Sequence, residues 1–299
     1  MSGFAAPWLW VVFTLIAAAA QTVRNATQSG LTVSLGTVGA TLVRFLFGFP
    51  FALVWLAGVM LALEETLPPL PFGYWPWVLG ASFAQIAATA LMLAAMGERS
   101  FVVVYAYLKT EPVQAAVFGL LFLGDVVTPG MAAAILIATA GVVGMALKPG
   151  SGSDFRSTLL GLAAGAMFAI SAVSFRGAIL SLGWASYVLA ASFTVLVGLF
   201  VSAVVLSVYL WLRAPKVLAA VVSAWRPSLF AGCMGALASE FWFLAFALTS
   251  AASVRTLALI EVLFAQGISH FVFKQSTGGR EVFGTLAIVV GVALLLWTH

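Results

Sequence analysis

The chain alternates long apolar stretches with short turns that carry its polar, glycine and proline residues. Each stretch is near or above the roughly 20 residues that a helix needs to cross a bilayer. The pattern predicts an all-α integral membrane protein with ten transmembrane helices. The predicted spans cover residues 4 to 27, 33 to 63, 73 to 97, 100 to 123, 129 to 147, 158 to 181, 184 to 212, 227 to 249, 251 to 273 and 282 to 297.

A transmembrane β-barrel is the other way to satisfy backbone polar groups in lipid. It requires ten-residue segments of alternating hydrophobicity, whereas this chain has long unbroken apolar runs. Composition agrees with the helical interpretation, since 63% of the residues are hydrophobic and only 7% are charged. Soluble domains carry about 25% charged residues. The spans leave almost no sequence for a domain outside the membrane.

An internal repeat divides the chain into two halves, residues 1–150 and 151–299. Glu111 and Glu261 stand 150 residues apart, each a few residues into an apolar span that follows a tight turn. Arg24 and Arg176 occupy similar places near the ends of the first and sixth spans. With five spans per half, the second half is inverted relative to the first. The sequence therefore predicts two inverted five-helix repeats around a central cavity.

Basic residues predict the orientation. Nine of them lie at or near the turns that follow odd-numbered spans, while Arg176 lies near an opposite turn. By the positive-inside rule the odd-numbered turns are cytoplasmic, so both termini are expected on the periplasmic side of a bacterial-type inner membrane. The nine residues are Arg24, Arg99, Lys148, Arg156, Arg213, Lys216, Arg226, Lys274 and Arg280.

The same residues exclude several kinds of chemistry. One cysteine, Cys233, cannot form an intrachain disulfide, and His270 and His299 are too few for a His/Cys metal site. Neither His270 nor Cys233 has neighbours in the sequence that would make a nucleophile and its base. The sequence also contains no phosphate-binding loop that ends Gly-Lys-Ser/Thr. We therefore expect no enzyme activity, no cofactor and no nucleic-acid partner. The expected partners are the lipid bilayer and a small-molecule substrate, with a monomer as the simplest assembly.

Seven charged residues are candidates for positions inside the membrane, where each costs about 3 kcal/mol and normally faces a partner or a wet cavity. They are Arg24, Arg44, Lys109, Glu111, Glu240, Arg255 and Glu261. Structural pairing between helices explains any one of them, but a shared cavity explains the group. The polar and aromatic residues near them complete a predicted substrate-binding set. This set consists of Gln21, Arg24, Gln85, Tyr105, Tyr107, Lys109, Glu111, Glu240, Trp242, Arg255 and Glu261.

The fourth span contains the densest group of these residues. Tyr107, Glu111 and Gln114 follow helical spacing and are expected to share one face. Pro112 removes the donor for the Leu108 carbonyl, so a bend is expected there and Pro112 is the predicted hinge. The second copy has Val262 instead, which predicts a smaller bend. Replacing Pro112 with alanine is expected to straighten the helix and slow exchange.

The segment Glu111-Pro112-Val113, together with the span ending Leu123-Gly124-Asp125, resembles the drug/metabolite transporter superfamily in its ten-helix EamA type. The repeat and the ten spans extend the resemblance over the whole chain. The second copy departs from it, because Val262 replaces the proline and Phe273-Lys274-Gln275 replaces the Gly-acid ending. The resemblance implies a metabolite exporter. It also implies cytoplasmic termini. The basic residues of this chain predict periplasmic termini instead, and we follow them.

An amino-acid substrate fits the residue inventory. A zwitterion needs a cation for its carboxylate, an acid or carbonyl for its ammonium group and apolar walls for its side chain. We therefore expect gradient-driven export of amino acids or related small metabolites by alternating access. A proton-coupled exporter of drugs or lipophilic cations is the alternative, although four intramembrane cations argue against it. A channel or membrane receptor is the alternative from another class, and the inverted repeat favours a carrier.

Overall fold

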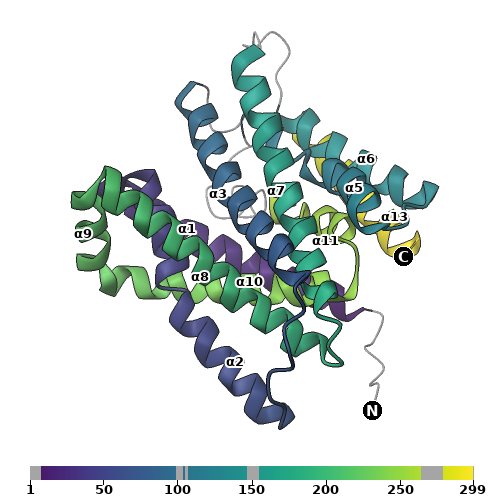
Figure 1. Ribbon diagram of the computed structural model, residues 1–299. Helices are drawn as coiled ribbons and strands as arrows, with labels where there is room; N and C mark the ends of the chain where they lie inside the picture. Colours follow the sequence, from purple (N-terminus) through teal and green to yellow (C-terminus); the bar gives the residue numbers. More distant parts are fainter. Residues whose placement is uncertain (1–7, 99–103, 105–106, 147–154, 264–278, 299) are drawn as a thin grey trace. The chain divides into compact units, whose positions relative to one another are not determined.

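The computed structural model describes residues 8–98, 104, 107–146, 155–263 and 279–298. Regular structure in these ranges is helical, with no β-strand among them (Figure 1). Within the same ranges, five segments are long and apolar enough to cross a membrane, and shorter apolar helices accompany them. The chain is thus a helical membrane protein by length and composition. The five segments are Ser34–Leu63, Thr158–Leu182, Tyr187–Arg213, Trp225–Leu248 and Gly279–Thr298.

The chain forms two compact units, each assembled from both halves of the sequence. Unit 1 contains Met1–Phe83 and Ser174–Leu248, and unit 2 contains Ala84–Val173 and Thr249–His299. The units are defined by contacts, whereas the repeat is defined by sequence similarity. The boundary between repeats at residues 150 and 151 therefore stays a prediction.

Unit 1 is built around the packing of α1 against α10, with α8 against both α10 and α2. A glycine permits the close approach of two backbones, since a Cβ on Gly232 of α10 would lie 2.5 Å from the Phe47 carbonyl carbon. The helices assigned to this unit are α1 (Leu9–Leu46), α2 (Phe49–Leu63), α8 (Tyr187–Arg213), α9 (Pro215–Ser223) and α10 (Trp225–Leu248), with the start of α3 (Tyr74–Glu98) and the end of α7 (Phe155–Leu182).

Helix α1 folds back on itself at Gly36. This residue has φ 65° and ψ 174°, a conformation available essentially only to glycine. The side-chain amide of Gln28 donates to the carbonyl of Ala40, although a straight helix would separate these residues by about 18 Å. The sequence predicts the first turn at residues 28 to 32, and the structure corrects this. The helical backbone continues through those residues, and its interruption lies at Gly36.

Unit 2 contains a tightly packed pair, α6 and α13, held together through glycines. A Cβ on Gly284 would lie 1.9 Å from the Met145 side chain, and one on Gly291 would lie 2.7 Å from Ala138. Small residues of this kind let transmembrane helices approach closely. The helices of this unit are α5 (Glu111–Leu123), α6 (Pro129–Ala146), α11 (Ala251–Leu257) and α13 (Gly279–Thr298), with the remaining parts of α3 and α7.

The Gly124-Asp125 ending of α5 is a helix terminus. Gly124 adopts the left-handed conformation at φ 67°, and the Asp125 backbone N–H donates to the Gly119 carbonyl at 3.1 Å. The Asp125 carboxylate lies so close to Gly119 that a Cβ there would meet it at 2.9 Å. The left-handed conformation explains why a glycine closes the apolar span.

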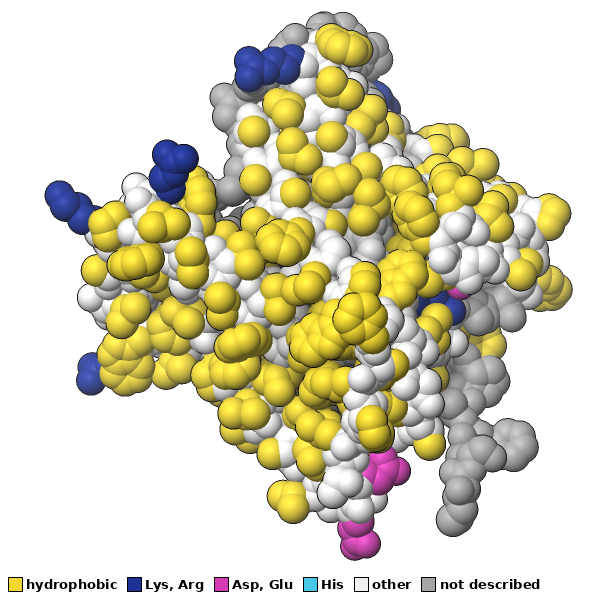
Figure 2. All heavy atoms as spheres, in the orientation of Figure 1, with side chains coloured by type: hydrophobic (Ala, Val, Ile, Leu, Met, Phe, Trp, Pro, Cys, Tyr) yellow, Lys and Arg dark blue, Asp and Glu magenta, His cyan; other side chains and the backbone are white. Residues whose placement is uncertain are grey.

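Apolar side chains dominate the surface. Figure 2 shows hydrophobic groups over the face in view, with Lys, Arg, Asp and Glu in a few places. Leu61 is 80% exposed, Phe72 and Trp297 are each 89% exposed, and Trp211 is 67% exposed. Such a surface suits hydrocarbon rather than water.

Candidate functional site

The first copy of the repeated segment is a broken helix. Tyr107 and Leu108 are helical, Lys109 and Thr110 form a turn, and α5 begins at Glu111. The Thr110 N–H donates to the Tyr107 carbonyl at 3.1 Å, which closes the turn. Pro112 thus lies in the first turn of α5, where no backbone donor is needed. The sequence predicts a bend at Pro112 within one helix, whereas the structure has an interruption just before it.

The second copy is interrupted at the matching place. Helix α11 ends at Leu257, Ala258 and Leu259 form a turn, and helical backbone resumes over residues 260–263. The Glu261 N–H donates to the Ala258 carbonyl at 3.1 Å. This break forms without a proline, whereas the sequence, with Val262 in place of Pro112, predicts only a smaller bend here. Both glutamates therefore follow a helix break by one or two residues.

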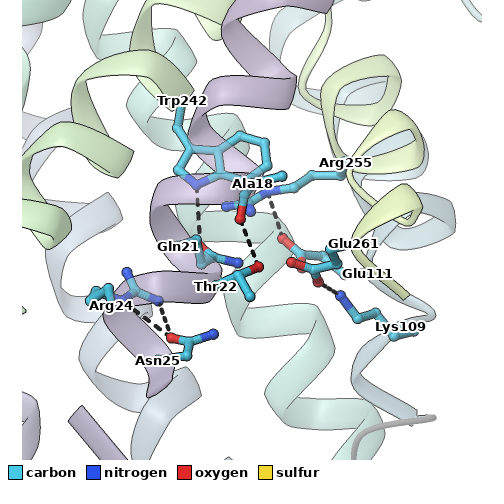
Figure 3. Close-up of polar contacts among 10 residues, drawn as sticks. All are labelled: Ala18, Gln21, Thr22, Arg24, Asn25, Lys109, Glu111, Trp242, Arg255 and Glu261. Atoms are coloured by element: carbon cyan, nitrogen blue, oxygen red, sulfur yellow. Dashed lines mark hydrogen bonds and ion pairs between the residues drawn. The ribbon is translucent and has the colours of Figure 1, made fainter. Parts of the chain in front are cut away.

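Two ion pairs connect the two copies in a crossed arrangement (Figure 3). The Lys109 ammonium group pairs with the Glu261 carboxylate. The Arg255 Nε lies 2.9 Å from the Glu111 Oε1. The base of each copy thus contacts the acid of the other copy, and all four residues belong to unit 2. Four of the predicted substrate-binding residues meet here.

The four side chains are largely shielded from solvent. Their exposed fractions are 13% for Lys109, 9% for Glu261, 19% for Arg255 and 17% for Glu111. Two positive and two negative charges cancel, which reduces the cost of burying them. Because each pair joins the two copies, a movement of one copy against the other that exceeds the reach of these side chains would separate the pairs or exchange their partners.

Helix α7 supports the first break. The Thr158 hydroxyl donates to the Tyr107 hydroxyl at 3.1 Å, and the Gln114 amide donates to the Leu162 carbonyl at 3.3 Å. Gly161 lies against the Tyr107 side chain, where a Cβ would come within 2.9 Å of the Tyr107 Cβ and 3.0 Å of its ring. Tyr107 and Gln114 therefore both contact α7. Glu111, the third residue of the predicted face, pairs with Arg255.

A second polar group lies in unit 1, between α1 and α10. The Trp242 indole N–H donates to the Gln21 side-chain oxygen at 3.2 Å (Figure 3). Arg24 donates twice to the Asn25 side-chain oxygen, at 2.7 and 3.2 Å, and is 6% exposed. Gly235 of α10 leaves room for the Arg24 and Arg44 side chains, since a Cβ would lie 3.4 and 3.3 Å from them.

Glu240 lies apart from this group although it belongs to the same helix. It is 2% exposed, and its carboxyl group accepts a hydrogen bond from the Ser192 hydroxyl of α8. The Trp55 indole of α2 bonds to the same carboxyl group. The sequence identified Glu240 by its charge but missed Ser192, because a serine in an apolar span carries no distinguishing signal.

The other predicted residues join neither group through a described contact. Gln85 is half-buried on α3, and its backbone carbonyl accepts a hydrogen bond from the Thr89 hydroxyl at 3.0 Å. Tyr105 lies outside the described residues, as does His270. Among the residues that are described, no cluster of His, Cys, Asp and Glu could hold a metal ion.

Comparisons with known proteins identify the fold but no family. No family model matches the chain, and no curated protein matches it. A solved structure, described only as the crystal structure of a protein, aligns with 98% of this chain and 96% of its own, with a TM-score of 0.70 and 15% sequence identity. At this identity the likeness shows the fold alone.

Proposed function

We propose that this chain is a secondary transporter that exports amino acids or related small metabolites by alternating access. In this proposal its ten spans form two inverted repeats, and the chain is a ten-helix EamA-type member of the drug/metabolite transporter superfamily. The observation that carries the proposal is the crossed pairing of Lys109 with Glu261 and Arg255 with Glu111 at two matched helix breaks. Broken helices near the middle of the membrane are where many secondary transporters bind substrate.

The crossed pairs suit a zwitterionic substrate for a reason of charge balance. An ammonium group can take the place of a base beside Glu111 or Glu261, and a carboxylate can take the place of an acid beside Lys109 or Arg255. A zwitterion brings both groups, so it can open a pair without leaving an unpaired buried charge, which would cost about 3–5 kcal/mol. A lipophilic cation supplies only one of the two signs. This favours an amino acid over the drug-export alternative.

The proposed orientation follows the positive-inside rule. Arg213, Lys216 and Arg226 cluster around the short helix α9, which connects two of the apolar segments. We place this connection on the cytoplasmic side of a bacterial-type inner membrane and both termini on the periplasmic side. Reporter fusions at the two termini check this orientation, and a cytoplasmic signal at either terminus would reverse it without changing the fold.

Counterflow in liposomes tests the transport function. Purified protein is reconstituted with an unlabelled candidate inside, and entry of the labelled compound is followed for a panel of amino acids, nucleotide sugars and lipophilic cations. We expect saturable counterflow of one or more amino acids. The matched control is Glu64→Gln, at an exposed position after α2, which should transport at the parental rate.

The panel also separates the competing functions. Counterflow of lipophilic cations without amino acids would support drug export, whereas linear flux without counterflow would support a channel. Lys109→Ala, Glu111→Gln and Glu261→Gln are expected to lower amino-acid counterflow at least about tenfold, because a charge-assisted bond contributes about 1.5–3 kcal/mol. Parental counterflow in all three folded variants would remove the crossed pairs from the function.

A further inference from the structure

Glu240 is a buried acid that the crossed ion pairs do not use. It lies on α10, away from both ends of that helix, and is 2% exposed. Its neighbours along the helix are the bulky apolar residues Phe241, Trp242 and Phe243. An acid so placed costs stability and is normally retained for a function.

Three helices of unit 1 meet at this carboxyl group. Ser192 comes from α8 and Trp55 from α2, and both bond to the Glu240 carboxyl. The Trp55 ring also lies edge-on against the Phe241 ring, with centroids 6.1 Å apart, which fixes the indole beside α10. The carboxyl group is thus held by neutral groups from two different helices.

These two partners can satisfy the acid in both of its protonation states. As a carboxylate, Glu240 accepts bonds from the Ser192 hydroxyl and the Trp55 N–H. As a carboxylic acid, it can donate its proton to the Ser192 oxygen, because a hydroxyl rotates between donor and acceptor roles, while its other oxygen still accepts from Trp55. Reversible protonation therefore leaves no buried group of this site without a hydrogen bond.

The cations that meet α10 contact it elsewhere. Arg24 and Arg44 of α1 pass beside Gly235, and Arg176 of α7 donates to the Phe246 carbonyl. These positions are about 7.5 and 9 Å from Glu240 along the helix axis. On α2, the charged residue Glu64 lies at the end of the helix, beyond Trp55. On α8, Arg213 lies at the end of the helix, whereas Ser192 lies near its start. Among the described residues, the partners of the carboxyl group itself are neutral, in contrast to those of Glu111 and Glu261, which pair with cations.

We propose that Glu240 carries the proton that drives transport. It takes a proton from water on one side of the membrane onto a carboxylate oxygen and releases it to water on the other side. The inference rests on the proposed transport function and adds its coupling ion. It assigns separate groups to the two tasks, with the crossed ion pairs binding substrate and Glu240 binding the proton.

Two transport assays on the same liposomes separate these tasks. The first is counterflow at equal pH on both sides, using the amino acid that the parental protein exchanges fastest. The second is accumulation of that amino acid driven by an imposed pH gradient. We expect Glu240→Gln to lower gradient-driven accumulation at least tenfold more than it lowers counterflow. Glu240→Asp should keep part of both, and Glu64→Gln should behave as the parent.

A spectroscopic readout covers variants that fold but transport poorly. The infrared difference spectrum between low and high pH of the purified protein should contain a buried carboxylic-acid carbonyl band, and Glu240→Gln should remove it. The proposal is overturned if the parent exchanges amino acids but ignores the pH gradient, if Glu240→Gln responds to the gradient as the parent does, or if the band survives in that variant. Absence of parental counterflow for every compound would instead overturn the transport function and this inference with it.

Discussion

Neutralising both members of a crossed ion pair should cost less stability than the sum of the losses from neutralising each member alone. At the 2.9 Å separation of Arg255 Nε and Glu111 Oε1, the attraction is about 6 kcal/mol for an effective dielectric constant of about 20. Most of this gain offsets the desolvation of the two charges. Glu111→Gln leaves Arg255 in place without its counter-charge, so we expect a loss of about 3 kcal/mol in the free energy of unfolding.

A double-mutant cycle measures this coupling. Glu111→Gln, Arg255→Gln and the double variant are unfolded in mixed micelles with a denaturant, and the three changes in unfolding free energy are compared. The double variant should lose less than the sum of the single variants, with an interaction energy of about 2–3 kcal/mol. The control cycle pairs Arg255→Gln with Glu64→Gln, which should be additive. Additivity in the Glu111 cycle would refute the pairing and with it the crossed arrangement.

Three further predictions concern the helices that position the site. Gly36→Ala should lower the free energy of unfolding by about 1–3 kcal/mol in denaturant unfolding, because φ at this position is 65°. The control Gly58→Ala, with open space around it, should not lower it, and equal stabilities of the two variants would contradict the reversal at Gly36. Gly284→Leu should lower the melting temperature through overpacking worth about 1–3 kcal/mol or more, while Gly144→Ala on α6 should leave it unchanged. A parental melting temperature for Gly284→Leu would exclude the close packing of α6 and α13. Pro112→Ala should keep counterflow within about twofold of the parental rate, because the second copy breaks at Ala258–Leu259 without a proline; a large slowing would restore Pro112 itself as the hinge.

The sequence predicted the helical membrane class and the charged residues of the site from simple physical costs. Glu111, Glu261, Lys109 and Arg255 stand out because few charges are retained in apolar spans. Their pairing could not be predicted from the repeat. The acids are 150 residues apart, but the residue 150 positions after Lys109 is Leu259, so the bases do not occupy equivalent places. The crossed contacts depend on how the two broken helices pack.

Two backbone features were beyond the sequence pattern for a different reason. Residues 28 to 32, the predicted turn, include polar residues and Gly30, yet the reversal of α1 requires a positive φ and occurs at Gly36. The break at Ala258–Leu259 has no glycine or proline to mark it. Turns of this kind are set by tertiary packing rather than by local residue preference. Ser192 was missed likewise, since its function depends entirely on the carboxyl group it faces.

The most direct test of the central claim is the accessibility of the first helix break from the two sides of the membrane. A single cysteine is placed at Thr110, in a Cys233→Ala background, and a membrane-impermeant thiol reagent is added to one side of oriented vesicles at a time. We expect labelling from both sides, with the exchanged amino acid raising labelling on one side and lowering it on the other. Labelling from one side only, or from both sides without any response to substrate, would contradict alternating access at the crossed ion pairs.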